Sequence, residues 1–546
     1  MLNNTPTCAA FPQLDDEQMR RVAEIGEPVT FADGQNLFES GQRDTPMFVI
    51  KSGSVEITED SSGESRSIVT HGPGDFTGDV DLLTARPVVV TGTARGPVEA
   101  YRVSQEKVRR LLNEIPTFSE MLLDAFQLRR RLLEESGFLG VRVIGPARSR
   151  ETSQLREFFY RNHVPHTFFD SGEPDGQEQL RKLHMEDAEL PVTACSKRIV
   201  SHPSLAQVAE CLGISRQIPN SLYDLVIVGA GPAGLAAAVY ASSEGLQTLV
   251  VDRVGPGGQA GSSSRIENFI GFPSGLSGQE LANRGYLQAL KFGTQFTAPI
   301  NVHSVERQAD GEHRLELCTG QIARARCVLV ATGVSFRQLD FEGCQRLEGA
   351  GVYYAATSVE ARVCGGSTAV VVGGGNSAGQ AAVYMADHAK RVKLLIRGDD
   401  LGKSMSAYLC RRILQHDKID LLKNSEVDGI QGDDFIESIW VRNNRTGQRE
   451  LVECAALFVF VGTKPHTEWL PKSVALDDKG FVLTGAGLQS DPRWPLERAP
   501  CELETTCPGV LAAGDVRAGT TKRCGFAVGD GSLAVACVHR YLNELA

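Results

Sequence analysis

Hydrophobic and polar residues alternate in short runs along the first quarter of the chain, and glycines separate these runs. Three of the runs are Met47–Lys51, Ser54–Thr58 and Val98–Val103, and each predicts a strand joined to the next by a glycine turn. Between Ser104 and Glu135, apolar residues recur at three- and four-residue steps, which predicts helix. We therefore expect residues 1–138 to form a β-rich barrel closed by helices.

The pattern changes to alternating strands and helices over residues 139–220. A strand-like segment opens this region and is followed by a predicted helix, Thr152–Asn162. After a second strand and helix, Leu190–Thr193 predicts a strand and Ser204–Leu212 a closing helix. This order predicts a small α/β sandwich.

The third region, residues 221–546, contains two glycine-rich strand–turn–helix units. In the first, the apolar strand Leu222–Val228 leads into glycines at 229, 231 and 234, which open a helix. The next strand ends in Asp252. Glycines permit the sharp turn and the close approach of a pyrophosphate to the helix N-terminus, and a terminal acid binds ribose hydroxyls. This unit predicts a dinucleotide site.

The second unit repeats the arrangement. The buried strand Thr368–Val372 feeds Gly373, Gly374 and Gly375, a helix follows, and the strand Val392–Ile396 ends in Arg397. An arginine at this strand end favours NADPH because it pairs with the 2′-phosphate, whereas an acid would favour NADH. Lys403 is a candidate for a further cation.

Composition narrows the functional classes. The 546 residues exceed one core, and 42% hydrophobic with 23% charged residues is typical of a globular protein. The net charge of -11 argues against a nucleic-acid partner or an anionic membrane surface. No apolar run is long enough to span a membrane and no secretory signal opens the chain, so a cytoplasmic location is expected.

Cysteine spacing also excludes classes. The 13 cysteines are scattered and no two form C-x-x-C, so neither a zinc site nor any other metal site is predicted. Most of them are expected to be reduced, buried residues.

Further motifs make a resemblance specific. Gly257-Gly258-Gln259, the segment Ile266–Pro273, Ala331-Thr332-Gly333 and Ala512–Asp515 follow the first glycine turn in order, and Val528–Gly531 is expected to open a last helix. This order resembles the low-molecular-weight thioredoxin reductase family over residues 221–546. The resemblance implies an α/β fold with two Rossmann-like subdomains, FAD at 221–340 and 466–546 and NAD(P)H at 341–465, and a homodimer.

The patterns and the resemblance together assign residues to FAD and NADPH. The residues assigned to FAD are Gly229, Gly231, Gly234, Asp252, Gly258, Gln259, Asn268, Ala331, Thr332, Gly333, Gly514 and Asp515. Those assigned to NADPH are Gly373, Gly375, Asn376, Ser377, Ala378 and Arg397. In the resembling family, the counterpart of Asp515 holds the flavin ribityl chain and the last helix points its N-terminus at the isoalloxazine ring.

The redox-active cysteine pair of that family is missing. Ala355 and Ser358 stand at its two positions, and neither side chain carries thiol–disulfide exchange. Cys364 lies nearby and is expected to be a core residue. No catalytic residue is therefore assigned, and the electrons of the reduced flavin are expected to leave for an external acceptor.

The nature of that acceptor stays open. A thioredoxin-, ferredoxin- or flavodoxin-like protein or a small molecule fits, since a thioredoxin-reductase-like ferredoxin/flavodoxin reductase also lacks the pair. Two alternatives remain: thioredoxin reduction through other cysteines, and a flavin-based redox sensor that signals through the N-terminal barrel.

Residues 1–138 resemble a cyclic-nucleotide-binding domain. The segments that show this resemblance are Gly34–Gly41, Phe48–Gly53 and Gly74–Asp79, which lie at the expected spacing. In nucleotide binders a glutamate contacts the ribose and an arginine after a proline binds the cyclic phosphate. Here Asp79 replaces the glutamate and Val88 the arginine, which argues against cAMP or cGMP and leaves a regulatory ligand or a packing role.

Residues 139–220 resemble a thioredoxin/glutaredoxin-like fold. Pro191 stands where that fold keeps a cis-proline. The segment Ala147–Thr152 replaces the C-x-x-C expected after the first strand, and Cys195 lies just beyond the proline. We expect this module to dock a partner or to space the domains and not to exchange thiols itself, with Cys195 as a buried thiol.

Overall fold

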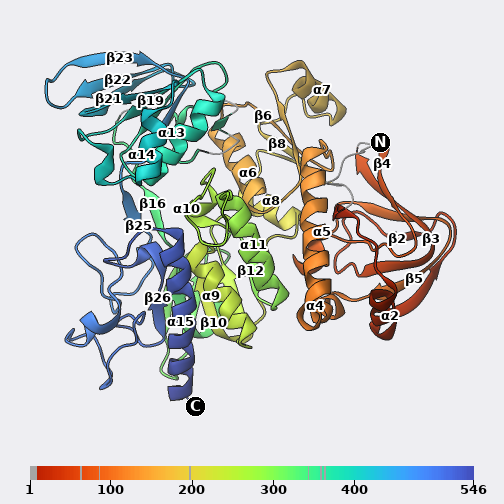
Figure 1. Cartoon of the computed structure of the whole chain (residues 1–546). Coiled ribbons are helices and arrows are strands. Elements are labelled where there is room, and N and C mark those ends of the chain that lie inside the picture. Colours follow the sequence, from red (N-terminus) through yellow and green to blue (C-terminus); the bar gives the residue numbers. More distant parts are fainter. Residues whose placement is uncertain are drawn as a thin grey trace. The chain divides into compact units, whose positions relative to one another are not determined.

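The computed structural model forms two compact units, each of which is described by itself (Figure 1). Unit 1 comprises residues 1–146, 158–217 and 286–299, and unit 2 comprises 147–157, 218–285 and 300–546. The described residues are 9–61, 64–84, 86–195, 198–341, 343–356, 360–361 and 364–545. Within these ranges, no helix has both the length and the apolar character needed to cross a membrane.

The first sheet of unit 1 contains the strands predicted for the barrel. Its order is β1-β5-β3-β4, with β2 paired to β5. The strands are β1 (Glu27–Phe31), β2 (Asn36–Phe38), β3 (Met47–Ser61), β4 (Glu64–His71) and β5 (Thr91–Val103). The prediction of two strands separated by a turn at Gly53 is wrong. Gly53 has φ +86° but lies within the single strand β3, where the register shifts between Ile50 and Ser54.

Helices follow this sheet. They are α2 (Asp16–Ile25), α3 (Asp81–Thr84), α4 (Gln105–Glu114) and α5 (Pro116–Glu135). The continuous helical stretch predicted from Ser104 to Glu135 is divided at Ile115. Pro116 has no N–H to continue the α4 ladder and restricts Ile115 to extended backbone, so it occupies the first turn of a new helix instead.

A second sheet of unit 1 has the order β7-β6-β8-β9. Its strands are β6 (Val141–Gly145), β7 (Thr167–Asp170), β8 (Val192–Cys195) and β9 (Arg198–Ser201). The helices along this stretch are α6 (Arg150–Arg161), which runs from unit 2 into unit 1, α7 (Pro174–Lys182) and α8 (Leu205–Cys211). The Leu190–Pro191 peptide bond is cis, as expected. Membership of the glutaredoxin-like fold stays a prediction.

The first sheet of unit 2 places the first glycine turn. Strand β10 (Leu222–Val228) pairs in parallel with β11 (Thr248–Val251) and with β15 (Ile322–Val330), and β15 pairs in parallel with β26 (Val510–Ala512). The antiparallel strands β13 (Val302–Arg307) and β14 (His313–Leu317) complete this side. Because β10, β15 and β26 are parallel, the segments after them meet at one edge of the sheet.

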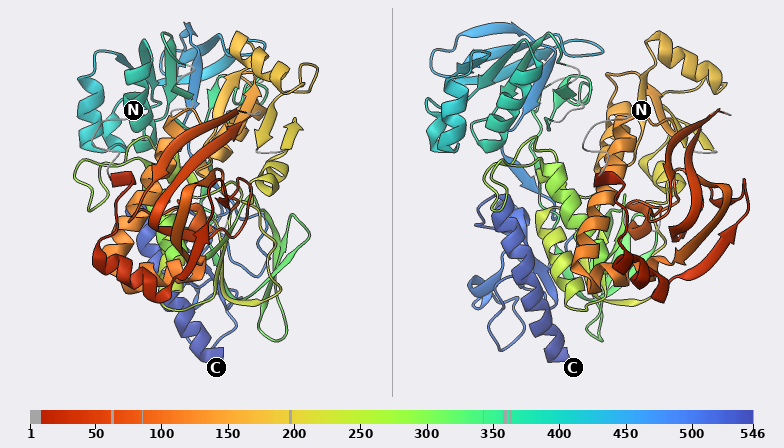
Figure 2. Two further views of the ribbon diagram at one scale, coloured as in Figure 1. Left: turned by 90° about the vertical axis from the view of Figure 1, so that its right-hand side faces the viewer. Right: turned by 45° about the vertical axis from the view of Figure 1, so that its right-hand side comes forward.

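Helix α9 (Pro232–Ser243) follows β10, and α15 (Cys524–Leu545) ends the chain. The two helices run side by side in all three views (Figures 1 and 2). Their approach is close because Gly531 has no side chain: a Cβ there would lie 2.2 Å from the carbonyl oxygen of Ala233. The last helix therefore belongs to the wall of the first glycine turn.

The second sheet of unit 2 has the order β17-β24-β18-β19-β20. Its strands are β17 (Val352–Tyr353), β18 (Thr368–Val372), β19 (Arg391–Leu395), β20 (Ile419–Leu422) and β24 (Ala456–Val459). Val371 packs against α13 (Asn376–His388) and α14 (Ala407–Leu414), whereas Val370 and Val372 pack toward a three-stranded sheet. That sheet consists of β21 (Ser425–Gln431), β22 (Ser438–Asn443) and β23 (Arg449–Glu453).

Each glycine motif thus follows a strand that pairs in parallel with its neighbours in its own sheet, and the predicted α/β organisation is confirmed. The segment Val459–Pro465 ends β24 and forms β25, which pairs with β16. The remaining elements are α10 (Gly258–Gly261), α11 (Gly278–Lys291), β12 (Gln295–Thr297), β16 (Val334–Phe336), β25 (Thr463–Pro465) and the 3-10 turns η1 (Leu401–Lys403), η2 (Gly485–Leu488) and η3 (Gly514–Val516).

Candidate functional site

The first glycine turn joins β10 to α9 and depends on missing side chains. Gly229 has φ +110°, and a Cβ there would lie 2.3 Å from the carbonyl oxygen of Ala331. At Gly234 a Cβ would lie 1.9 Å from the carbonyl oxygen of Gly229. Only glycine fits at these two positions, so the motif is required for the turn itself.

Gly231 and Gly258 line an open space at the start of α9. A Cβ on Gly231 would meet only the Cα of Gly258, at 3.9 Å. Gly231 is also the N-cap of α9 and no side chain caps the helix, so its first N–H groups are available to a ligand. Exposed helix-terminal N–H groups beside side-chain-free space fit a pyrophosphate.

Asp252 follows β11 and holds the turn in place. Its Oδ2 accepts a hydrogen bond from the N–H of Ala230 at 2.7 Å, and its Oδ1 accepts from Val254 at 2.8 Å and Gly255 at 2.7 Å. The sequence indicated a ribose-binding carboxylate. The structure adds a second task, since the same side chain ties the glycine turn to the loop before Gly258.

Further residues assigned to FAD lie in two places: directly after β15, and in α10 with the loop that follows it. Ala331 and Thr332 follow β15 and lie against Gly229, and the Thr332 hydroxyl donates to the carbonyl oxygen of His466 at 2.8 Å. Gly333 comes next, with φ +60°. Gln259 lies in α10 beside Gly258, whereas Asn268 is exposed in the following loop. The role of Asn268 therefore stays a sequence prediction.

The segment after β26 meets the same edge of the sheet. Gly514 lies against α9, where a Cβ would stand 3.0 Å from that of Ala233. The N–H of Gly514 donates to Asp530 Oδ2 at 3.0 Å, and Arg517 donates to the same oxygen at 2.7 Å. Sequence reasoning named Asp530 without a role and missed Arg517. The only sequence signal for this contact was the carboxylate of Asp530 in the predicted last helix.

Asp515 lies in a partly buried, charged environment. Burial raises the pKa of Asp515, nearby Asp530 adds to the rise, and Lys522 opposes it. The last helix begins at Cys524, so the expectation that Val528–Gly531 opens it is wrong by one turn. Gly529 and Gly531 lie inside the helix, and Gly531 is the one that contacts α9. Burial also raises the pKa of Cys524 to about 11, so this thiol is protonated at neutral pH.

The second glycine turn joins β18 to α13. Gly373 has φ +142°, and a Cβ there would lie 2.7 Å from the carbonyl oxygen of Phe460 and 3.1 Å from the Cβ of Ala378. Gly375 is the N-cap of α13 without a side-chain cap, and nothing lies within 4 Å of its absent Cβ. Asn376 and Ser377 begin the helix. The five assigned NADPH residues other than Arg397 thus gather at one helix N-terminus.

A loop folds over this second turn. Ser404 Oγ donates to the carbonyl oxygen of Gly374 at 2.8 Å, and the N–H of Ser406 donates to Asn376 Oδ1 at 2.7 Å. Neither serine was found from the sequence, because both lie about thirty residues after the glycines.

Cations collect beyond the end of β19. The Arg397 side chain is 78% exposed and its single ion pair among the described residues, to Glu426, is long at 3.9 Å. Lys403 and Arg445 both contact Asp399 at 3.0 Å. Lys403 and Arg445 therefore share one carboxylate and Arg397 has only a long contact with another, so this group of cations suits a 2′-phosphate. Arg445 was missed because it lies in the distant turn between β22 and β23.

The positions of the missing dithiol lie near β17. Ala355 is half-buried after β17, and Ser358 lies outside the described residues. Cys364 is fully buried in the core beneath α13, and burial raises the pKa of its thiol to about 12. The prediction that Cys364 is a core residue is confirmed.

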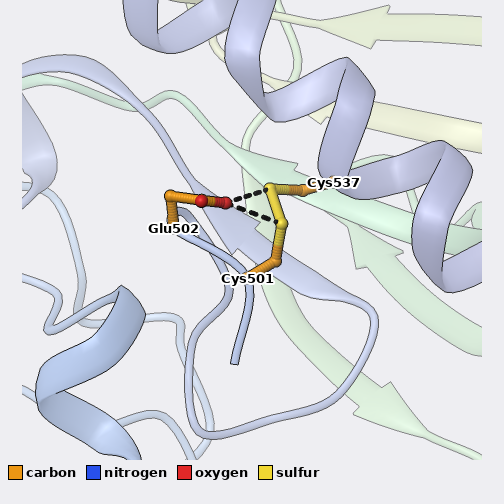
Figure 3. Close-up of side chains that lie close together, drawn as sticks. All are labelled: Cys501, Glu502 and Cys537. Carbon is orange, nitrogen blue, oxygen red and sulfur yellow. Dashed lines mark hydrogen bonds between the residues drawn. A yellow bond between two sulfur atoms is a disulfide. The ribbon is translucent and has the colours of Figure 1, made fainter. Parts of the chain in front are cut away.

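The structure contains one disulfide that the sequence did not indicate, between Cys501 and Cys537 (Figure 3). Cys537 lies on α15 and Cys501 on the loop before β26, 36 positions earlier. The Glu502 carboxylate lies 3.0 Å from Cys501 Sγ and 3.8 Å from Cys537 Sγ. Together the three ligand atoms lie within 4.8 Å, but sulfurs joined in a disulfide offer no thiolate to a metal.

The cyclic-nucleotide-like segment of unit 1 has internal partners for its expected ligand contacts. Arg130 contacts both Asp79 and Asp81 at 2.7 Å. Arg86 is buried and donates to the carbonyl oxygen of Asn162 at 2.6 Å. Asp79, which the sequence placed opposite a ribose, is therefore bound to an arginine of α5.

Comparisons with known proteins match the N-terminal and C-terminal parts of the chain to two different families. The pyridine nucleotide-disulphide oxidoreductase family matches residues 223–531, and the cyclic nucleotide-binding domain family matches residues 28–114. A thioredoxin reductase of Listeria monocytogenes is 32% identical over 333 residues, which are 60% of this chain and 96% of that protein. A thioredoxin reductase of Bacillus subtilis is 31% identical, with 60% and 96% covered.

A solved structure is also similar. The thioredoxin reductase of T. acidophilum has 28% sequence identity and a TM-score of 0.53, and the similarity covers 60% of this chain and 99% of that one.

Proposed function

Because the chain belongs to the pyridine nucleotide-disulphide oxidoreductase family, with a thioredoxin-reductase-like part after a cyclic nucleotide-binding domain, we propose that it uses NADPH and FAD to reduce an external acceptor without the family's dithiol at positions 355 and 358. It is an NAD(P)H-dependent flavoprotein oxidoreductase, and thioredoxin reductase family members use FAD and NADPH. The proposal adds the route by which electrons leave the reduced flavin.

The residues that would hold the two cofactors fit them. Gly231 and Gly258 leave space at uncapped N–H groups for the FAD pyrophosphate, and Gly375 does the same for NADPH. Arg397 would pair with the 2′-phosphate. When bound, FAD supplies a carrier that takes two electrons from a nicotinamide and releases them singly or together.

The observation that carries the proposal is Ala355. It occupies the first position of the family's cysteine pair, so no thiol there can relay electrons from the flavin to thioredoxin. Ser358, at the second position, has a hydroxyl, which forms no disulfide. The reduced flavin must then deliver its electrons to the acceptor directly.

Cys364 and Cys537 are poorly suited to replace the pair. Cys364 has no exposed surface and a raised pKa, so little reactive thiolate forms. Cys537 lies thirteen positions after the first residue of α15. At 1.5 Å per residue this is about 20 Å from the helix N-terminus that we place at the flavin, beyond direct exchange.

Acceptor kinetics test the proposal. We expect the purified protein to oxidise NADPH rapidly with ferricyanide, a one-electron acceptor, and to oxidise NADPH with thioredoxin no faster than an enzyme-free control. The measurement is NADPH oxidation at 340 nm with each acceptor at equal concentration.

A cysteine variant supplies the control. Cys364→Ser is expected to leave the ferricyanide rate unchanged, because the thiol is not on the electron path. Thioredoxin reduction that is rapid in the wild type and lost in Cys364→Ser would contradict the proposal and favour a displaced thiol relay. In that case the thioredoxin-reductase alternative holds.

A further inference from the structure

Unit 1 contains a cavity that neither the flavin nor the nicotinamide site uses. It has a volume of about 400 Å³, within the range of small-molecule sites. One wall is the loop that carries Arg86 and Val88, with Arg43 beside it, and the other comes from the second sheet and α8. All of its lining residues belong to unit 1.

The cavity is cationic. Arg43, Arg86, Arg130 and Arg198 line it, and Asp81 is the one carboxylate among the described lining residues. Asp79 and Asp81 neutralise Arg130. Within the part of the chain that the structure describes, no carboxylate forms an ion pair with the other three arginines. Such a surplus of positive charge, with Arg86 buried and Arg43 and Arg198 exposed, suits an anion.

A partly buried histidine on the same wall does not reduce this surplus. Desolvation and the charges of Arg86 and Arg130 together lower the pKa of His163 to about 3. The imidazole is therefore neutral at physiological pH, and the arginines keep the cavity cationic.

Two thiols face this cavity from different elements. Cys195 ends β8 and Cys211 ends α8, and both line the cavity. The two thiols hydrogen bond to each other. Cys195 is 3% exposed, whereas Cys211 is half-buried. One thiol is thus accessible from the cavity and the second lies directly behind it.

The environment distinguishes the two thiols chemically. The hydrogen bond from Cys195 and the charge of Arg198 together lower the pKa of Cys211 to about 7, against the effect of burial. The same contact raises the pKa of Cys195. At pH 7 about half of Cys211 is thiolate, compared with about one thirtieth of an ordinary cysteine.

We propose that Cys195 and Cys211 form a redox pair that reduces an anionic low-molecular-weight disulfide bound among Arg43, Arg86 and Arg198. The Cys211 thiolate attacks one sulfur of the ligand, which forms a mixed disulfide and releases one ligand thiolate. Cys195 passes its proton to that thiolate and attacks Cys211 Sγ. The Cys195–Cys211 disulfide forms and the second ligand thiolate leaves.

The step balances without the flavin site. The Cys211 thiolate and the Cys195 thiol together lose two electrons, and the ligand disulfide gains them and leaves as one thiol and one thiolate. A cyclic nucleotide, the ligand of related barrels, has no sulfur for this chemistry. Its ribose contact is also occupied, because Asp79 pairs with Arg130.

Peptide mapping of the full chain tests the proposal. The prereduced, desalted protein is treated with glutathione disulfide, a carboxylate-bearing probe. We expect a Cys195–Cys211 disulfide peptide, and a trapped Cys211–glutathione adduct in Cys195→Ser. Carboxamidomethylation of Cys211 by iodoacetamide should follow pH with a midpoint near 7. Cys410→Ser, at another half-buried cysteine near a helix end, is the control and should change neither result.

Charge selectivity tests the anion site separately. Glutathione disulfide should react at least about tenfold faster than neutral 2-hydroxyethyl disulfide, each normalised to its rate with free cysteine. Arg198→Gln should reduce this preference and move the alkylation midpoint upward. Absence of the disulfide peptide, an alkylation midpoint at or above about 8.5, or equal rates for the two probes would overturn the proposal.

Discussion

Gly234→Ala is expected to yield a colourless protein. The new Cβ would stand 1.9 Å from the carbonyl oxygen of Gly229, and both atoms belong to the backbone path of the turn. No side-chain rotation relieves this contact, so α9 must move away from β10 and its first N–H groups leave the pyrophosphate site. We expect FAD binding to weaken at least about 100-fold, which is about 3 kcal/mol.

Flavin content measures this effect. The ratio of absorbance at 450 nm to that at 280 nm is compared with wild type, and FAD is then titrated back into the apoprotein. Gly487→Ala is the matched control, since nothing lies within 4 Å of its absent Cβ. Far-UV circular dichroism distinguishes local loss of the site from unfolding. A yellow Gly234→Ala protein with native affinity would show that α9 does not bind the cofactor.

Arg397→Gln is expected to remove the preference for NADPH. Arg397 is largely exposed at the end of β19 and only weakly paired, so its charge is available to the 2′-phosphate. A charge-assisted contact of about 1.5–3 kcal/mol corresponds to roughly a 10- to 100-fold loss of kcat/KM for NADPH. The value for NADH should barely change, because NADH has no 2′-phosphate.

Steady-state kinetics with ferricyanide measure both nucleotides. The matched control is Arg391→Gln at the opposite end of the same strand, where Arg391 pairs with Asp420 at 2.6 Å. That variant should keep the wild-type ratio of NADPH to NADH. Equal losses for both nucleotides in Arg397→Gln would place the 2′-phosphate elsewhere, and Lys403 or Arg445 would be tested next.

The two glycine turns were predictable because their chemistry is local. Leu222–Val228 and Thr368–Val372 form strands with the predicted bounds, and the residues after them open helices. Apolar runs, steric demands at Gly229 and Gly373, and helix starts all lie within a few residues of one another. Such signals do not depend on the rest of the fold.

Distant contacts were not predictable in the same way. Asp530 reaches Gly514, and Ser404 reaches Gly374, only after the chain has folded. The Cys501–Cys537 disulfide joins positions that no sequence spacing marks. Each of these depends on how helices pack on sheets, and a single sequence carries no direct record of that packing.

Predictions from short sequence segments were also wrong at some glycines, because glycine occurs both in turns and where two elements pack closely. Gly53 was taken to end a strand, yet it is accommodated within β3 at a shift of register. The two glycines at 529 and 531 suggested a helix start, but they lie inside α15, where Gly531 permits contact with α9. A glycine marks a close approach or a turn, and only tertiary context distinguishes them.

The central claim is that the flavin is the only two-electron centre on the electron path from NADPH. An anaerobic titration with dithionite, followed at 450 nm, counts the electrons directly. We expect complete bleaching with one two-electron equivalent per FAD and no lag, because neither Ala355 nor Ser358 accepts electrons. Consumption of two equivalents, the first without full bleaching, would reveal a disulfide in exchange with the flavin and contradict the account.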